Sequence, residues 1–413
     1  MDISVINSIQ EQFNKNEATY LAASLTHRKS ALDFVLLHDL PDRKDEEYKY
    51  TPVNRILKKN FDFEKIVTSN STHLNFKDHF YKLKGNHLVF LNGTYLPAQS
   101  IILNDICCQT EVDSKQTFKD VFDALNVAFC KNSLKIEVNE HYRPQPFFIY
   151  YFYDSEQGQV FGNPNIQITA HSNTRIQILE KTISTGTHPV FINKKVGVHV
   201  KANAQVNITK IQNYKKHIFQ VYNLEVNQDA QSTFNSNVYS SAGGLIRNNL
   251  SINQLGEHCE SHMHGLYLIT GHSHVDNHTS VNHTQPNSYS NELYKGILDE
   301  NARAVFNGKI FVRPEAQKTN AFQSNQNINL SDSASIHTKP QLEIWADDVK
   351  CSHGCTVGQM DEEALFYLRA RGIGKNQAKA LILIAFSEQS LEYIPFEFVK
   401  EEIDTLIRKR LIG

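Results

Sequence analysis

The sequence predicts a mainly β fold in which a solenoid of short strands, residues 96–349, lies between helical segments at both ends of the chain. Short runs in this stretch alternate apolar and polar residues at period two, as Ile166–Ile168 and Val196–Val200 do. Clusters of Asn, Gly, Ser and Asp separate the runs at intervals of about 30 residues or somewhat less, and no helix-period segment interrupts residues 165–285. A β-sandwich is the competing fold, but the runs are numerous and the stretch is longer than one sandwich needs.

The N-terminal region, residues 1–95, is predicted to be mainly helical. Apolar residues recur at helical spacing in two stretches, Ile3–Ile9 and Ala31–Val35, and Pro41 ends the second. A charged connector bounded by prolines follows at residues 41–52, and its composition predicts a solvated loop.

The C-terminal region, residues 350–413, is predicted to end in a small helical module. Asp361 is a suitable N-cap, because its carboxylate can accept hydrogen bonds from the free amides of the first turn. Gly372 is expected to end this helix. A second helix is expected around Ala378–Ala385, and a third from Phe396 to Leu411.

The composition argues against two classes of protein. Mean hydropathy is -0.43, and no apolar run approaches the roughly 20 residues that span a bilayer, so a transmembrane protein is excluded. Lys and Arg number 42 against 44 Asp and Glu, without the basic excess of a general nucleic-acid binder. The first residues lack a basic segment followed by an apolar run, so the expected location is the cytoplasm.

Seven of the 19 histidines fall within one short segment: His258, His262, His264, His272, His274, His278 and His283. Residues two apart on a strand share a face, so His272, His274, Asp276 and His278 are expected on one side. Val275, Thr279 and Val281 are expected on the other. Imidazole and carboxylate on one face could bind a transition metal. The favoured interpretation is a polar ladder that forms hydrogen bonds between coils.

A second cluster, Lys350-Cys-Ser-His-Gly-Cys355, combines thiol and imidazole groups that suit iron and zinc. A closed zinc site needs two ligand pairs, and this motif supplies one short group. Taken alone, the motif favours Cys351 and Cys355 as buried structural residues, with contact to a soft metal as the alternative, and His353 is expected at a strand end or turn. Cys107, Cys108 and Cys130 lie in apolar surroundings and are predicted to be small core residues.

The sequence contains none of the common catalytic signatures. It has no P-loop, no Gly-x-Gly-x-x-Gly after a strand, no Gly-x-Ser-x-Gly and no His-Glu-x-x-His. Asp347 and Asp348 form a carboxylate pair without recognisable partners, and they are predicted to lie at a solvated strand end or turn.

Six segments carry the most specific pattern in the chain: Leu293–Asp299, Ala304–Ile310, Ala316–Asn320, Lys339–Ile344, Ala346–Gly354 and Leu365–Ile373. Together they resemble the SufB/SufD family, scaffold proteins of iron–sulfur cluster assembly. Residues 41–52 resemble the N-terminal signature of that family, and His274–Val281 resembles its solenoid core. The resemblance therefore covers nearly the whole chain.

The resemblance implies a right-handed parallel β-helix and a non-enzymatic scaffold subunit. Such a subunit pairs with its paralogue SufB through the β-helix, docks the ATPase SufC, and helps to assemble nascent clusters for acceptor proteins. The cluster would be transient and shared with SufB, with no cofactor held tightly by the isolated chain. Self-pairing of the isolated chain is also expected, because an unpaired strand edge invites a partner.

The resemblance also implies site residues. His353, with Cys351 beside it, matches the position implicated in cluster formation at the SufB interface, so His353 is the expected transient metal ligand. The SufC-docking element matches the helices at about 361–386. Its expected contact residues are Leu365, Phe366, Tyr367, Leu368, Arg369 and Arg371.

Some positions depart from the family pattern. SufB typically carries a cysteine in the segment matching 325–332, where this chain has none, which favours the SufD branch. Cys355 stands where a small residue is expected, and Tyr48 stands where tryptophan is common. Cys355 is either a third ligand or a passive substitution. Two other functions compete with the scaffold: a stand-alone metal-binding solenoid, and a polysaccharide-active β-helix enzyme, for which no convincing carboxylate pair is found.

Overall fold

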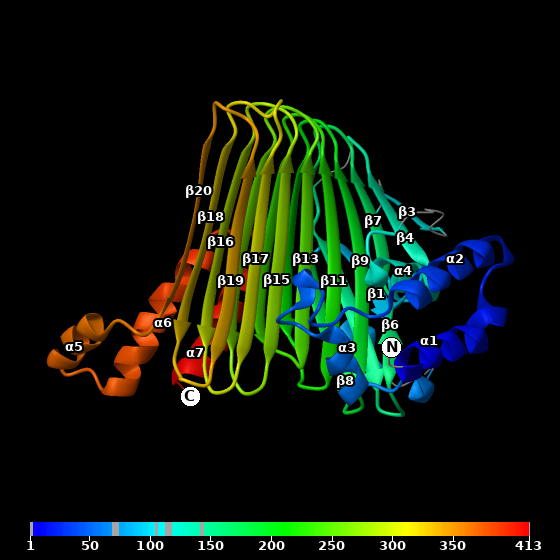
Figure 1. Ribbon diagram of the computed structural model, residues 1–413, viewed down its shortest axis with the longest axis horizontal. Helices are drawn as coiled ribbons and strands as arrows, with labels where there is room; N and C mark the ends of the chain where they lie inside the picture. Colours follow the sequence, from blue (N-terminus) through cyan, green and yellow to red (C-terminus); the bar gives the residue numbers. More distant parts are fainter. Residues whose placement is uncertain (1–2, 68–73, 104–105, 112–117, 141–143, 413) are drawn as a thin grey trace.

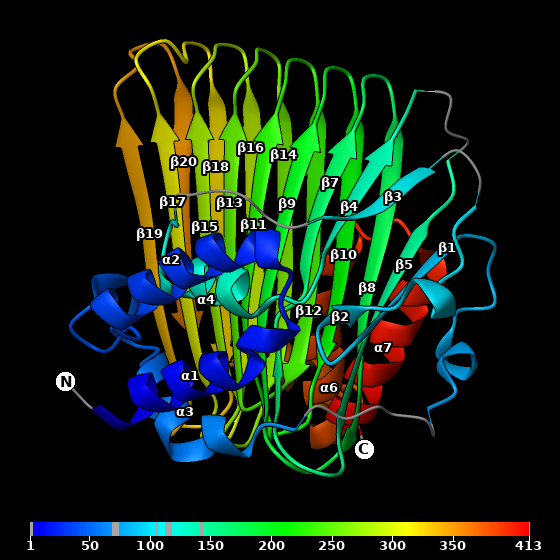
Figure 2. The same ribbon diagram turned by 90° about the vertical axis from the view of Figure 1, so that its right-hand side faces the viewer.

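The computed structural model describes residues 3–67, 74–103, 106–111, 118–140 and 144–412. Its central feature is a β-solenoid in which successive strands alternate between two facing sheets (Figure 1; Figure 2). The mainly β solenoid between terminal helices is the predicted fold. None of the helices in the described ranges is long and apolar enough to cross a membrane.

We call the two sheets sheet I and sheet II. Sheet I contains, in spatial order, β2 (Thr94–Tyr95), β1 (Asn86–Leu91), β5 (Phe147–Ser155), β8 (Arg175–Gly186), β10 (Gln205–Asn213), β12 (Thr233–Ala242), β14 (Glu260–Ile269), β16 (Tyr289–Leu298), β18 (Asn320–Asn329) and β20 (Lys350–Gly358). Sheet II contains β19 (Ser335–Ile344), β17 (Arg303–Val312), β15 (His274–His283), β13 (Leu245–Gln254), β11 (Ile218–Gln228), β9 (Val190–Val200), β7 (Asn165–Ala170), β4 (Ser133–Val138) and β3 (Ile106–Glu111), with β6 (Val160–Gly162) beside β9. The named strands pair in parallel except β1 with β2 and β3 with β4.

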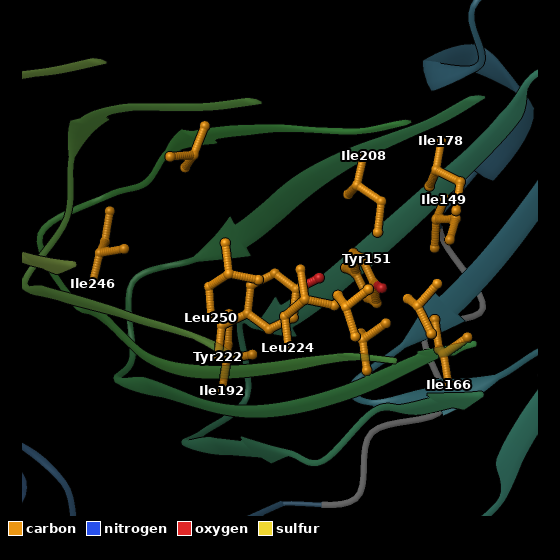
Figure 3. Close-up of a cluster of buried hydrophobic side chains, with 14 of the residues drawn as sticks. Ile149, Tyr151, Ile166, Ile178, Ile192, Ile208, Tyr222, Leu224, Ile246 and Leu250 are labelled. Carbon is orange, nitrogen blue, oxygen red and sulfur yellow. The ribbon is translucent and has the colours of Figure 1, made fainter. Parts of the chain in front are cut away.

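The two sheets enclose a continuous apolar core. Every second residue of each strand points inward, and isoleucine, leucine and valine dominate these positions. Figure 3 shows part of this core, in which Ile208 of sheet I and Leu224 and Leu250 of sheet II belong to one cluster of buried side chains. Each buried aliphatic side chain contributes about 1.5–3 kcal/mol, so every coil is stabilised by stacking on the next.

One corner of the solenoid repeats the same strained turn. A residue with positive φ lies between a strand of sheet II and the next strand of sheet I at six successive corners: Asn173, Asn203, Gln231, His258, Asn287 and Lys318. The intervals between them are 30, 28, 27, 29 and 31 residues. Asparagine tolerates this left-handed conformation better than most residues, which explains the Asn-rich turn clusters of the sequence.

Helices cover the outer faces of both sheets. On sheet II lie α1 (Ile3–Asn16), α2 (Ala22–His38), α3 (Val53–Asn60) and α4 (Val121–Phe129), which share an apolar cluster with outward residues of β9, β11 and β13 (Figure 2). On sheet I lie α6 (Lys375–Leu391) and α7 (Glu397–Ile412), which pack on outward residues of β12, β14 and β16. Between β20 and α6, α5 (Glu362–Ala370) extends beyond the strands (Figure 1). Short 3-10 turns occur at Glu17–Thr19, Glu46–Tyr48, Phe63–Lys65, Phe76–His79 and Pro97–Gln99.

Two details differ from the sequence prediction. Strands begin before residue 96, at Asn86, and continue past residue 349 to Gly358. The connector, residues 41–52, is a solvated loop only in part: residues 42–46, 49 and 50 are exposed, whereas Tyr48 is buried against the outer face of sheet II. The Arg247 guanidinium lies 3.8 Å from the centre of the Tyr48 ring.

Candidate functional site

One end of the solenoid is formed by β19 and β20, and we call it the open end. In the described part of the chain, each of these strands pairs with a neighbour on one side only, and β20 forms the outer edge of sheet I (Figure 1). Such a strand presents unpaired N–H and C=O groups that another chain can extend. The open end is therefore a surface of the solenoid that is suited to pair with another β chain.

The cysteine and histidine cluster lies on the interior face of β20. Parallel neighbours in register face the same side of a sheet. The register aligns the cluster with buried interior residues of β18: Cys351 with Ala321, His353 with Gln323 and Cys355 with Asn325. No further coil covers these side chains, so His353 and Cys355 are exposed at the mouth of the solenoid. His353 thus lies in the middle of a strand, which corrects the expected strand end or turn.

The two cysteines of the cluster have different surroundings. Cys351 is half-buried and packs near Ile310, Val312 and Leu342, and this burial raises the pKa of its thiol. A raised pKa disfavours the thiolate, which is the form that binds metals. Cys355 is exposed.

The cluster cannot enclose a metal ion alone. Residues two apart on a strand are separated by about 6.6 Å, so Cys351 and Cys355 lie on opposite sides of His353 at twice that spacing from one another. Among the described residues, no group of three His, Cys, Asp or Glu side chains is arranged to hold a metal ion. The open end offers separate donors that need ligands from elsewhere.

The histidine-rich face has a structural role on sheet II. His274, Asp276 and His278 share the outer face of β15 as predicted, whereas His272 lies in the preceding turn, which corrects its expected place. The connector covers this face: Thr51 Oγ1 lies 3.0 Å from His274 Nε2, and Glu47 Oε2 lies 3.2 Å from His278 Nδ1. The face is used for docking the N-terminal segment.

Charges on this face are balanced within the fold. Burial alone would raise the pKa of Asp276, but Arg247 at 2.6 Å and His278 hold the pKa of this carboxyl well below its usual range. The hydrogen bond from His278 lowers the pKa of Glu47 to about 2, and Lys309 also pairs with Glu47. Burial lowers the pKa of His274 to about 4, so this imidazole is neutral at pH 7. The bond between coils on this face joins Arg247 on β13 to Asp276 on β15, whereas the ladder interpretation expected histidine and aspartate to bond between coils.

The C-terminal helix α5 presents an exposed apolar surface. Asp361 caps it by accepting from the amides of Glu363 and Ala364, both at 3.0 Å. Phe366 is 75% exposed and Tyr367 is 56% exposed. Exposure of two adjacent aromatic side chains is unusual unless something covers them.

The other expected docking residues in and next to α5 differ in how far their side chains are exposed. Leu365 is buried and Leu368 is half-buried, so they support the helix rather than offer contacts. Arg369 and Arg371 are exposed, and the Arg371 guanidinium lies 4.6 Å from the centre of the Tyr367 ring. The available surface of α5 therefore combines two aromatic side chains with the acidic Glu362 and Glu363 in its first turn and the basic Arg369 and Arg371 near its end.

The remaining predicted residues lie as follows. Cys130 is buried, and Cys108 is only half-buried at the margin of the core; the side chain of Cys107 lies outside the described residues. Asp347 and Asp348 are exposed in a turn, as predicted.

Sequence reasoning missed the polar residues inside the solenoid. A salt bridge of 3.1 Å joins Lys194 and Glu180, both buried between the sheets. Nearer the open end, Gln323, Asn325 and Asn327 all point inward from β18. The repeat interval of the coils could have identified Gln323 and Asn325, because they lie 30 residues before His353 and Cys355.

Comparison with known proteins gives consistent matches. The profile described as "SUF system FeS cluster assembly, SufBD core domain" matches residues 152–386. The iron-sulfur cluster assembly protein SufD of Escherichia coli (strain K12) is 30% identical over 394 residues, which cover 92% of this chain and 92% of that protein. The SufBD family protein slr0076 of Synechocystis is 29% identical over 93% of this chain and 90% of its own length. The chloroplastic protein ABCI7 of Arabidopsis thaliana is 25% identical over 91% of this chain and 83% of its own length.

Proposed function

The chain belongs to the SufBD family of the SUF system of iron–sulfur cluster assembly, and we propose that it is a non-catalytic, SufD-type scaffold subunit. In this proposal the chain pairs with SufB, docks the ATPase SufC, and supports nascent clusters that pass to acceptor proteins. The cytoplasm is the proposed location. The family match favours this role over a carbohydrate-active solenoid.

The observation that carries the proposal is the open end. His353 and Cys351 point inward from an edge strand with an unpaired side, so a SufB chain that extends this edge would face both side chains. Imidazole and thiolate are suitable iron ligands. Because this chain cannot enclose an ion with its own described residues, any cluster formed here is shared with the partner and exchangeable.

The proposed SufC contact is α5. Phe366 and Tyr367 supply an exposed aromatic pair of the kind that anchors protein interfaces, and Arg369 and Arg371 add charge around it. ATP chemistry is assigned to SufC, which agrees with the lack of a P-loop in this sequence.

Replacement of His353 by alanine tests the proposal. His353→Ala should leave the thermal unfolding temperature unchanged, because the side chain is exposed, and should lower the yield of iron–sulfur cluster in the co-purified assembly about tenfold or more. Iron and acid-labile sulfide are measured per assembly. Ser352→Ala, one residue away on the outer face, is the matched control. An unchanged cluster yield in His353→Ala would refute the assigned role.

A further inference from the structure

Three polar residues form one inward-facing row at the open end. The strand registers align Glu292 on β16 with Gln323 on β18, and Gln323 with His353 on β20. Neighbouring strands lie about 4.8 Å apart, so each side chain is within reach of the next. Glu292 and Gln323 are 1% and 3% exposed, whereas His353 is exposed at the mouth. The row therefore leads from the buried interior to the expected iron ligand.

The Gln323 amide is held in one orientation. Its Nε2 donates a hydrogen bond of 2.7 Å to Glu292 Oε2. On the opposite sheet, Gly308 leaves the space for this amide, since a Cβ there would lie 1.9 Å from Gln323 Nε2. Above the pKa of about 7 that burial gives Glu292, its carboxylate can only accept, so the nitrogen of the Gln323 amide lies on the inner side and its oxygen on the other.

The remaining oxygen of this amide is unused. Gln323 Oε1 is buried and accepts no hydrogen bond from any described residue. An unpaired buried acceptor is destabilising, so such a group in a native structure calls for a donor. The neighbouring inward amide differs, because Asn325 bonds to Tyr267, the Tyr294 carbonyl and Asn327. Gln323, the residue that aligns with His353, thus carries a free acceptor.

We propose that Gln323, oriented by Glu292, is the positioning residue for His353. Gln323 Oε1 accepts the N–H of the nearer imidazole nitrogen. This bond fixes the tautomer, so the other nitrogen is unprotonated and points to the mouth, where a metal can be bound. Histidine ligands are commonly oriented through the second ring nitrogen in this way. The link to iron rests on the proposed function of His353, whereas the hydrogen bond does not.

The hydrogen bond is tested directly in the full chain. Histidine labelled with ¹⁵N in the ring reports the tautomer by NMR at a pH where the imidazole is neutral, and His353→Ala identifies the signal. Wild type should show one dominant tautomer. Gln323→Met, which keeps length and burial but removes the acceptor, should give the mixture of an unrestrained imidazole. Gln326→Met, on the outer face of the same strand, is the control and should leave the signal unchanged.

A double variant that exchanges Glu292 and Gln323 controls for loss of folding. In the double variant Glu292→Gln with Gln323→Glu, the amide at position 292 donates to the carboxylate at position 323. The second oxygen of that carboxylate is then free to accept from His353. This double variant should restore the single tautomer. Identical ring signals in wild type and Gln323→Met, or a mixture in the exchange variant despite wild-type unfolding temperature, would overturn the proposal.

Cluster formation separates this inference from the proposed function. In the co-purified assembly, Gln323→Met should lower cluster yield about tenfold, and it should cause no further loss when His353 is already alanine. If His353→Ala has no effect on cluster yield, the scaffold role of that residue fails while the tautomer result stands. If the tautomer of His353 is the same in Gln323→Met as in wild type, the positioning role of Gln323 is refuted, and the proposed role of His353 is unaffected.

Discussion

At the scale of single residues, the interior of the solenoid holds ionisable groups that a packed β core normally lacks. Glu292 is fully enclosed, and its carboxylate accepts a hydrogen bond from the Gln323 amide. Burial raises the pKa of Glu292 from 4.5 to about 7. The folded protein therefore binds this proton more tightly than the unfolded chain, and stability should fall as pH rises between these two values.

Replacement of Glu292 by glutamine should remove this dependence. Above pH 7 the wild-type carboxylate is charged in an apolar interior, so Glu292→Gln should be more stable there by up to about 3 kcal/mol, at about 1.4 kcal/mol per pKa unit. Near pH 4.5 the two proteins should have similar stability. Urea unfolding at both pH values measures the difference. A stability gain of the same size at both would show that packing, and not ionisation, is responsible.

At the scale of elements, the connector joins the N-terminal helices to the solenoid through polar contacts. Glu47 bonds to His278 and Lys309, Thr51 bonds to His274, and the Tyr50 and His337 rings stack with centroids 3.8 Å apart. These contacts reach β15, β17 and β19, so the connector ends beside the open end.

Glu47→Gln should loosen the connector. The low pKa of Glu47 means that its carboxylate contributes stability above pH 4.5, which is lost as pH falls toward 2. At pH 7 the variant should show faster hydrogen exchange of backbone amides in residues 41–52, measured by mass spectrometry. Glu46→Gln removes only the exposed pair with Lys339 and should have little effect. Equal exchange in wild type and Glu47→Gln would contradict this account of docking.

The proposed contact between α5 and SufC is best tested by substitution of its exposed residues. Removing all residues after 360 would also remove α6 and α7, and would expose the apolar outer face of sheet I. Phe366→Ala with Tyr367→Ala should instead reduce co-purification of SufC at least tenfold without changing the unfolding temperature, because both side chains are exposed. Leu37→Ala on α2 is the control, with a side chain that is also 75% exposed. Full retention of SufC by the double variant would refute α5 as the contact.

At the scale of the whole molecule, the solenoid is a stack in which each coil contacts mainly its neighbours. The proposed assembly follows from its open end and from α5, which lie on the same side of the molecule (Figure 1). Co-expression with SufB and SufC should yield an assembly with one copy of this chain, one SufB and two SufC, as measured by native mass spectrometry. A chain that purifies alone, or only with copies of itself, would contradict the scaffold proposal.

Much of this architecture could be predicted from local patterns. The alternation in Val196–Val200, the Asn-rich turns and the Asp361 cap depend on neighbours in sequence, and each was predicted correctly. The docking of Tyr48 could not be predicted, because it depends on Arg247, about 200 residues away. The strand that carries His353 was missed because the last coil is uncovered and shows no apolar alternation.

The two ends of the solenoid also differ in what can be added to them. At the far end, the antiparallel strands β2 and β3 replace the parallel coil, so that edge does not match the one offered by β19 and β20. A chain with matching ends would join head to tail into an open filament. In the proposed pairing, the partner occupies the parallel edge formed by β19 and β20, so the expected product is a pair of defined size rather than a fibre.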